Sequence, residues 1–332
     1  MLDVKSLSYD DVRSLIAKRK GWDRVPKKFN IISDTSDFFR VEYDDVLILA
    51  GRLYWIKSNE REGRFGLDDE PKYWVRRAYD LEDDSTKILK MVFHEEFETK
   101  TAGVAIKCFR SPMKEARILD LVADHRNFMH GQWANDSAGN NVRIIEYISG
   151  RQFVEIVATY GRDHEDYFYS FFPQVLDQYI ELVEAIKFLH DHGEKHGDIR
   201  RDHILYDSAR KVNRWIDFDY NYMHGESMWS LDLLGLGNIL IFLVGRGDVL
   251  VQDLYRTQRE LFDSLWGEDL NISYKNRVAN LQKIYAYIPD SLNRILLHFS
   301  YGAQIFYDNT EQMLDDLTFA KADVSALTGR GT

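Results

Sequence analysis

The first third of the chain carries short apolar runs that polar residues interrupt, which is the pattern of β-strands. Four such runs lie between Val46 and Phe109, with the sequences VLILAGRLYWIK, KYWVRRAYDL, TKILKMVFHEEFE and GVAIKCF. They are rich in aromatic and β-branched residues and are separated by charged or turn-forming pieces. A further run, VRIIEYISG at Val142 to Gly150, predicts one more short strand that ends in a turn.

Apolar residues recur at helical spacing in one segment of this strand-rich part and in most of the chain beyond it. In SPMKEARILDLVAD, Ser111 is the expected N-cap and Pro112 fits the first helical position. The segment FFPQVLDQYIELVEAIKFLHDHG carries an apolar stripe, and Gly193 supplies its C-terminal stop. Two segments near the C-terminus, SLNRILLHFSYGAQ and NTEQMLDDLTFA, predict further amphipathic helices.

This order of elements predicts an α+β protein with two lobes. We expect an N-terminal extension over residues 1–40, partly helical around YDDVRSLIAKR, a strand-rich first lobe over 41–149 and a helical second lobe over 150–332. The chain has only five prolines and no low-complexity tract, so a short connection is expected between the lobes.

Composition narrows the classes of protein to consider. A formal net charge of −11 does not suggest nonspecific nucleic-acid binding. Cys108 is the only cysteine, which excludes an internal disulfide framework and favours a reducing compartment. The longest apolar run, LDLLGLGNILIFLVG, contains Asp232 and fits a buried helix better than a membrane span. The N-terminus lacks the pattern of a signal peptide, so we expect a cytoplasmic protein.

Acidic residues gather in two stretches, KHGDIRRDHILYD and WIDFDYNY. Asp198 and His203 flank a turn before ILYD, and RWIDFD reads as a second strand that a hairpin joins to the first. Asp198, His203 and Asp217 are therefore expected at neighbouring ends of the hairpin, facing a common space. Carboxylates that converge in this way repel each other unless cations lie between them, and Mg²⁺ carried by a nucleotide would supply that charge.

These stretches resemble the protein-kinase-like superfamily. HGDIRRDH matches the catalytic loop H-R-D-x-x-x-x-N with two substitutions, and DFD matches the metal motif D-F-G with one. The resemblance covers roughly residues 45–320 and is strongest from Asp191 to Gly237. It implies a two-lobed protein-kinase-like fold, ATP with Mg²⁺ or Mn²⁺ as cofactors, and a hydroxyl-bearing acceptor.

The resemblance also implies roles for the charged residues of both stretches. Asp198 would accept or orient the proton of the acceptor hydroxyl, and Arg200 would neutralise charge on the moving phosphoryl group. Asp217 would hold a metal ion against the phosphates, with His203 at the second-metal position. Asp219 replaces the glycine of D-F-G and adds a carboxylate to the metal-binding set.

A lysine on the third kinase-like strand would pair with phosphate oxygens. The resemblance implies Lys90 for this role, with Glu115 as its partner on the following helix. Lys107 is the rival, because VAIK spells the family motif. It lies only eight positions before Glu115, which leaves little room for a strand end and a helix entry, so Lys90 is favoured.

The remaining expected nucleotide contacts come from a loop and a strand. EGRFG lies where the family has its glycine-rich loop and offers Gly63 and Gly66, while IIEYISG resembles the hinge strand and offers Glu146 and Ile148. Asp232 stands where the family has a buried structural acid, and we expect it to cap backbone amides of the catalytic loop.

The departures from the family pattern leave several functions open. Histidine replaces the motif's asparagine at 203, an exchange that resembles kinases of lipopolysaccharide cores. The H-G-D sequence, with Gly197 in place of arginine, resembles that of aminoglycoside-type kinases. Asp217 and Asp232 are only 15 positions apart and no A-P-E follows, so regulation by activation-loop phosphorylation is not expected. We expect an ATP-dependent phosphotransferase, with a serine/threonine protein kinase-like enzyme ahead of a small-molecule kinase. The same pattern leaves open a nucleotide-binding pseudokinase and an adenylyl transferase.

Overall fold

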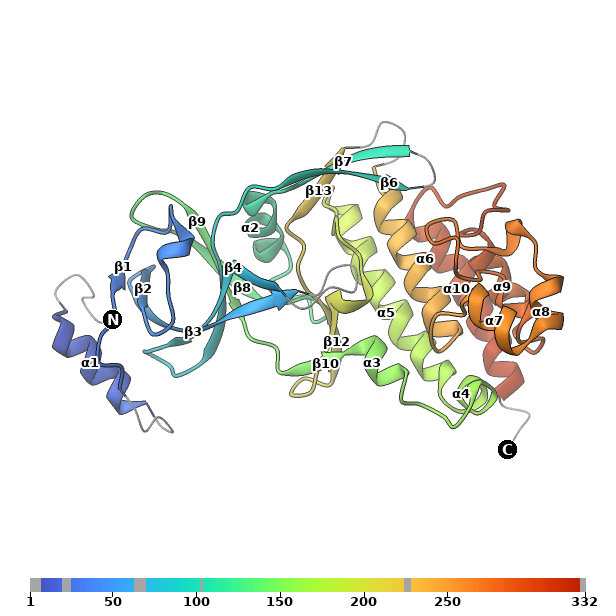
Figure 1. The fold of residues 1–332 in the computed structure, drawn as a ribbon, viewed down its shortest axis with the longest axis horizontal. Helices are drawn as coiled ribbons and strands as arrows, with labels where there is room; N and C mark the ends of the chain where they lie inside the picture. Colours follow the sequence, from blue (N-terminus) through green and yellow to red (C-terminus); the bar gives the residue numbers. More distant parts are fainter. Residues whose placement is uncertain (1–6, 20–24, 63–69, 102–103, 224–227, 329–332) are drawn as a thin grey trace. The chain divides into compact units, whose positions relative to one another are not determined.

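The computed structural model describes residues 7–19, 25–62, 70–101, 104–223 and 228–328 (Figure 1). The chain divides into two compact units. Unit 1 comprises Met1–Glu95, Arg110–Asp124 and Met129–Ile148. Unit 2 comprises Glu96–Phe109, His125–Phe128 and Ser149–Thr332.

Unit 1 is built on a seven-stranded sheet with the order β1-β2-β3-β4-β5-β9-β8. All neighbouring strands are antiparallel except β1 and β2, which are parallel. The strand-like runs of the sequence thus form strands, although TKILKMVFHEEFE is divided between β5 and β6. The strands are β1 (Ile31–Ile32), β2 (Val46–Leu49), β3 (Arg52–Glu62), β4 (Glu70–Asp80), β5 (Thr86–Lys90), β8 (Gly131–Asn135) and β9 (Asn141–Glu146).

Both faces of this sheet are packed, because successive strand residues point to opposite sides. On β2, Leu47 and Leu49 join one apolar cluster, whereas Val46 joins another. The second cluster is covered by helix α1 (Tyr9–Lys18), which contributes Val12 and Ile16. The helix of the N-terminal extension is therefore packed into the core of unit 1.

Helix α2 (Pro112–Leu121) packs against β8 and β9. As the sequence predicts, the Ser111 hydroxyl caps the helix by accepting the amide N–H of Lys114, and Pro112 occupies the first turn. The apolar face at Ala116 and Leu119 is buried. The cap fixes where α2 begins, and this places Glu115 in its first turn.

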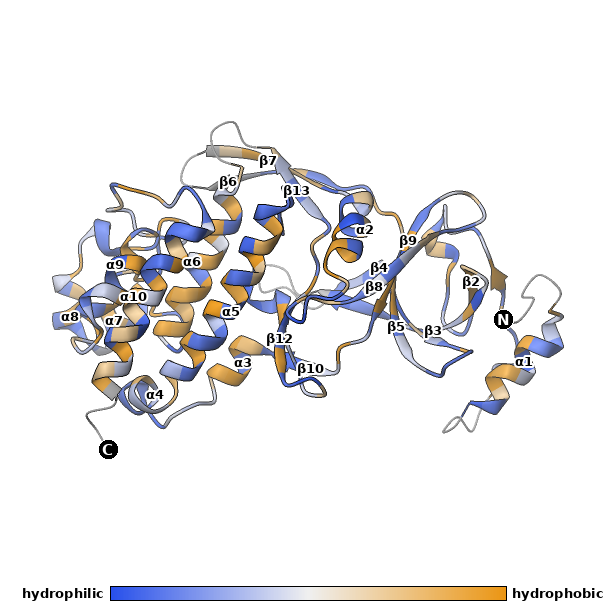
Figure 2. Ribbon diagram, turned by 180° about the vertical axis from the view of Figure 1, so that it is seen from behind, coloured by the Kyte–Doolittle hydropathy of each residue, from blue (hydrophilic) through white to orange (hydrophobic). Residues whose placement is uncertain are grey.

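Unit 2 is mainly helical. Helix α5 (Phe172–Asp191) packs against α6 (Ser230–Val244) and α10 (Thr310–Thr328), and apolar residues recur along α5 and α6 (Figure 2). Gly193 adopts a φ of 74° just beyond α5 and supplies the predicted stop. The other helices are α3 (Phe153–Val157), α4 (His164–Ser170), α7 (Val251–Thr257), α8 (Arg259–Ser264) and α9 (Asp290–Leu297). The short 3₁₀ turns of the chain are η2 (Phe38–Arg40), η3 (Arg201–His203), η4 (Gly267–Asp269) and η5 (Leu281–Lys283).

Two three-stranded sheets flank the helices of unit 2, in the orders β10-β11-β12 and β13-β7-β6. The predicted hairpin is formed by β11 and β12, with Ile204 opposite Trp215. Its second strand stops at Trp215 and does not continue through RWIDFD, because Asp217 adopts a φ of 64° that no strand residue has. The strands are β6 (Glu96–Thr101), β7 (Val104–Arg110), β10 (Gly150–Gln152), β11 (Ile204–Asp207), β12 (Val212–Trp215) and β13 (Tyr220–Met223).

Within the described ranges, every helix falls short of the length or the apolar character that crossing a membrane requires.

Candidate functional site

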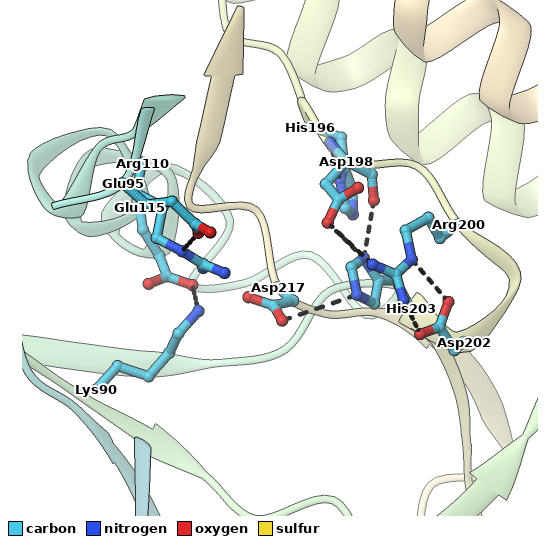
Figure 3. Close-up of polar contacts among 10 residues, drawn as sticks. All are labelled: Lys90, Glu95, Arg110, Glu115, His196, Asp198, Arg200, Asp202, His203 and Asp217. Carbon is cyan, nitrogen blue, oxygen red and sulfur yellow. Dashed lines mark hydrogen bonds and ion pairs between the residues drawn. The ribbon is translucent and has the colours of Figure 1, made fainter. Parts of the chain in front are cut away.

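A buried ion pair joins the sheet and the helix of unit 1. Lys90 ends β5, and its Nζ lies 2.7 Å from Oε1 of Glu115 on α2 (Figure 3). The side chains are 6% and 0% exposed. Lys107 instead pairs with Glu96 at 2.8 Å and is 56% exposed, so the predicted pairing of Lys90 with Glu115 is confirmed.

Arg143 is a further cation at this ion pair, and the sequence reasoning missed it. Its Nε donates to Oε2 of Glu115 at 3.0 Å, and its side chain is 1% exposed. Arg143 lies directly opposite Lys90 in the β5–β9 register, which explains why both reach the same carboxylate. An arginine inside the apolar run NVRIIE is the signal that could have found it, because buried charges are almost always paired.

In unit 2, one buried acid organises the loop that carries Asp198. Asp232 on α6 accepts the backbone N–H groups of His196 and Gly197 at 2.8 and 2.9 Å. Burial by itself would raise the pKa of Asp232, but its hydrogen bonds and the electrostatic effect of the neighbouring histidines outweigh burial and hold this pKa below its usual range. The expectation that Asp232 caps amides of the loop is confirmed.

The three residues expected at the hairpin ends lie together in unit 2 (Figure 3). His203 Nδ1 donates to the backbone carbonyl of Asp198 at 2.8 Å and lies 3.6 Å from its Oδ2. On the other side of the ring, Nε2 lies 3.7 Å from Oδ2 of Asp217. His203 therefore stands between the two acids, and the three residues lie close together, as we expected of the ends of the hairpin.

The surroundings of Asp198 raise the pKa of its carboxyl group. Burial is the main cause of a raised pKa at Asp198, and the negative charges of Asp217 and Asp219 add to it. The charges of His203 and Arg200 act in the opposite direction without cancelling the effect. A partly buried carboxyl with a raised pKa beside other charged groups is typical of functional sites.

Arg200 lies beside Asp198 but also binds a nearer partner. Its guanidinium makes two contacts with Asp202, one of them 3.1 Å long, and its NH1 lies 3.9 Å from Oδ2 of Asp198 (Figure 3). Asp202 therefore neutralises part of the positive charge of Arg200, which we expected to act on a phosphoryl group. Phosphate binding by Arg200 remains a prediction.

The backbone at Asp217 adopts a positive φ of 64°, and the two residues that follow it are buried. Phe218 is fully buried and lies against the rings of His196 and Phe128, with centroids 6.0 and 6.2 Å apart. Asp219 is 2% exposed. Burial of Phe218 anchors the segment and leaves the carboxylate of Asp217 beside His203.

The remaining expected contacts of the nucleotide stay predictions. Glu146 ends β9, and its Oε1 accepts the backbone N–H of His130 at 3.2 Å. Ile148 is 8% exposed within unit 1. Gly63 and Gly66 lie outside the described residues.

The geometry of the acids bears on which metal ion they would suit. The described residues contain no group of three or more His, Cys, Asp or Glu side chains arranged to hold a metal ion. Magnesium at phosphoryl-transfer sites takes one or two carboxylates and completes its shell with water and substrate phosphates, so it needs no such group. The carboxylate of Asp217 is a hard ligand of the kind that this mode of binding uses, whereas the imidazole of His203 beside it is a softer ligand. Metal binding by Asp217, Asp219 and His203 stays a prediction.

Known proteins similar to this chain include several kinases. No protein-family model matches the chain. A putative ribosomal protein S6 kinase alpha-2 of Caenorhabditis elegans is 27% identical over 184 residues, which cover 54% of this chain and 21% of the relative. CBL-interacting protein kinase 3 of Oryza sativa subsp. japonica is 30% identical over 91 residues, or 26% of this chain and 18% of the relative. The matches thus span about a fifth of the length of these relatives.

A third relative is the 2-5A-dependent ribonuclease of Mus musculus, 32% identical over 83 residues that cover 24% of this chain and 11% of the relative. Among solved structures, the PknI kinase domain of Mycobacterium tuberculosis is 13% identical, with 84% of this chain and 99% of that domain covered and a TM-score of 0.42. The kinase relatives and the mixed architecture of sheet and helices show that the chain has a protein-kinase-like fold of the α+β class.

Proposed function

We propose that the chain is an ATP-dependent phosphotransferase that moves the γ-phosphoryl group to a hydroxyl acceptor. The observation that carries this proposal is the cluster of Asp198, His203 and Asp217. Asp232 holds backbone amides of the loop that carries Asp198. A buried lysine with a carboxylate partner, Lys90 with Glu115, supports it.

In this proposal, Asp198 accepts the proton of the acceptor hydroxyl as its oxygen bonds to the γ-phosphorus, while the bond from phosphorus to the ADP oxygen breaks. The raised pKa makes Asp198 a stronger base than an exposed carboxylate. Asp217 would hold Mg²⁺, which supplies positive charge to the phosphate oxygens, and Lys90 would pair with a phosphate oxygen. Positioning and electrostatics therefore supply most of the catalysis.

We further propose a serine or threonine hydroxyl of a protein as the acceptor. The names of two relatives as protein kinases support this choice. The H-G-D sequence with Gly197 and the short segment from Asp217 to Asp232 instead favour a sugar or aminoglycoside-type acceptor.

The first prediction concerns Asp198→Asn. We expect turnover of ATP to fall by about 10²- to 10⁴-fold, the usual contribution of a general base, while binding of ATP with Mg²⁺ persists in a thermal-shift assay. Asp191→Asn is the matched control, because Asp191 is an exposed acid that pairs with Lys187 on its own helix. Turnover that survives in Asp198→Asn would remove this residue from its assigned role.

The acceptor is tested with two assays on the wild-type chain. Transfer of label from ATP to the chain itself or to a protein mixture supports a protein acceptor, whereas ATP consumption with sugars, aminoglycosides or lipopolysaccharide-core sugars supports a small molecule. Binding of ATP with no turnover in either assay would indicate a pseudokinase. A product that gains AMP in mass spectrometry would contradict phosphoryl transfer.

A further inference from the structure

Glu115 binds two cations, one at each carboxylate oxygen. Lys90 Nζ lies 2.7 Å from Oε1 and Arg143 Nε lies 3.0 Å from Oε2. The three side chains are nearly or fully buried, with exposed fractions of 6%, 0% and 1% for Lys90, Glu115 and Arg143. A buried carboxylate is stable only when it is paired. The effect of moving one cation therefore depends on whether the other cation stays in contact with Glu115.

Arg143 is tied to the sheet by contacts that do not involve Lys90. Its NH1 donates to the carbonyl of Asn141 at 2.8 Å, and its NH2 donates to the carbonyl of Met91 at 3.3 Å. A guanidinium has a rigid, planar set of donors, so these two bonds also fix the direction of Nε toward Glu115. Arg143 therefore holds Glu115, and α2 with it, to strand β9.

We propose that Arg143 is a positioning residue that keeps Glu115 and α2 docked on the sheet whether or not Lys90 contacts the carboxylate. If Lys90 were the only cation, its movement toward an anion would leave a buried carboxylate without a partner. With Arg143 present, the carboxylate stays paired and the ammonium of Lys90 is available to a phosphate. The phosphate part of this inference rests on the proposed function, whereas the docking of α2 does not.

The docking of α2 is tested by hydrogen exchange of its backbone amides over Pro112–Leu121 in the full chain. We expect Arg143→Met to speed exchange by about tenfold or more, the scale of losing a close charge contact. Lys90→Met should leave exchange near the wild-type rate, because Arg143 still holds Glu115. Arg77→Met is the control, since Arg77 is in the same sheet and pairs with Glu60.

Nucleotide affinity gives the second readout. We expect Arg143→Met to raise the Kd for ATP with Mg²⁺ by about tenfold, because Glu115 then neutralises Lys90. In a Glu115→Gln background the same Arg143→Met change should have little further effect, since Arg143 acts through the carboxylate. Arg143→Lys keeps the positive charge but not the planar set of donors, so it should show a smaller change of the same sign. It replaces Arg143→Met in both assays if that variant does not fold.

Two outcomes would overturn the inference. One is unchanged exchange of α2 in both Arg143 variants, and the other is exchange in Lys90→Met as fast as in Arg143→Met. If neither the wild type nor any variant binds ATP, the proposed function fails, yet the exchange rates still decide whether Arg143 docks α2.

Discussion

Single residues of α6 position the loop that carries Asp198. Asp232 holds two amides of this loop, and Gly235, about one turn further along the helix, lies against Ile199. A Cβ built on Gly235 would stand 2.6 Å from both the carbonyl oxygen and the Cβ of Ile199. The helix thus fixes the loop through one buried acid and through the absence of one side chain.

This contact predicts the effect of Gly235→Ala. Helix propensity alone favours alanine over glycine by about 1 kcal/mol, but the collision with backbone atoms outweighs that gain. We expect the loop to shift and turnover to fall by about ten- to a hundredfold, because misplacement by about 1 Å has costs of this size. Gly267→Ala is the control, since a Cβ there meets nothing within 4 Å. Wild-type turnover and unfolding temperature in Gly235→Ala would contradict the prediction.

At the scale of elements, the β6–β7 hairpin pairs with β13, the strand that directly follows Asp219. Strand β13 pairs with β7, and Ile106, Cys108 and Tyr222 form an apolar cluster with Leu231 packed against it. Lys195, in the loop that carries Asp198, donates to the carbonyl of Tyr222 at 2.9 Å. Tyr220–Met223 is therefore held in place by pairing and packing.

Excision of the hairpin tests this role. Replacing 96–109 by two glycines is feasible because Glu95 and Arg110 are already joined, with the amide of Arg110 2.9 Å from the carbonyl of Glu95. We expect limited proteolysis to cut around Tyr220–Met223 at least about tenfold faster, since an unpaired strand is easily opened. Phe97→Ala, which removes a ring contact with Tyr220 and leaves the hairpin in place, is the control. Equal cleavage of the excised and wild-type chains would show that β13 is ordered without the hairpin.

At the scale of the whole molecule, a partly buried histidine, His164, makes the stability of the fold depend on pH. His164 begins α4, its Nε2 donates to the carbonyl of Val244 at 2.8 Å, and its Nδ1 accepts the hydroxyl of Tyr287 at 2.6 Å. Burial lowers the pKa of His164 to about 4, and the positive charge of Arg246 acts in the same direction. The hydrogen bond to Val244 and the negative charge of Asp163 oppose this shift without cancelling it. The folded protein therefore holds this imidazole neutral.

The sign of the pH effect follows from that pKa. Between the usual pKa of about 6.5 and the folded pKa of about 4, the unfolded chain binds the proton more tightly, so stability is lost as pH falls through this window. Allowing for partial solvent screening, we expect a loss of roughly 1 to 2 kcal/mol between about pH 7.5 and pH 5. Urea unfolding at both values should show a smaller loss in His164→Phe than in the wild type. His192→Asn, an exposed control, should keep the wild-type difference.

Much of this architecture could be predicted because its signals are local. Apolar runs define the strands, Ser111 and Pro112 begin α2, Gly193 ends α5, and the short β11–β12 hairpin suffices to bring Asp198 and Asp217 together. The roles of the site residues in catalysis and binding stay predictions that the experiments above test.

The sequence by itself determined the element types, the caps, and the spacing of the acids, because these depend on residues a few positions apart. Only the tertiary structure decided that Arg143 reaches Glu115, that β7 pairs with β13, and that Ile199 packs against Gly235 where a side chain would collide with it. Each of these contacts joins segments distant in sequence. Strand register and packing choose such partners, and a local pattern of apolar and polar residues does not encode them.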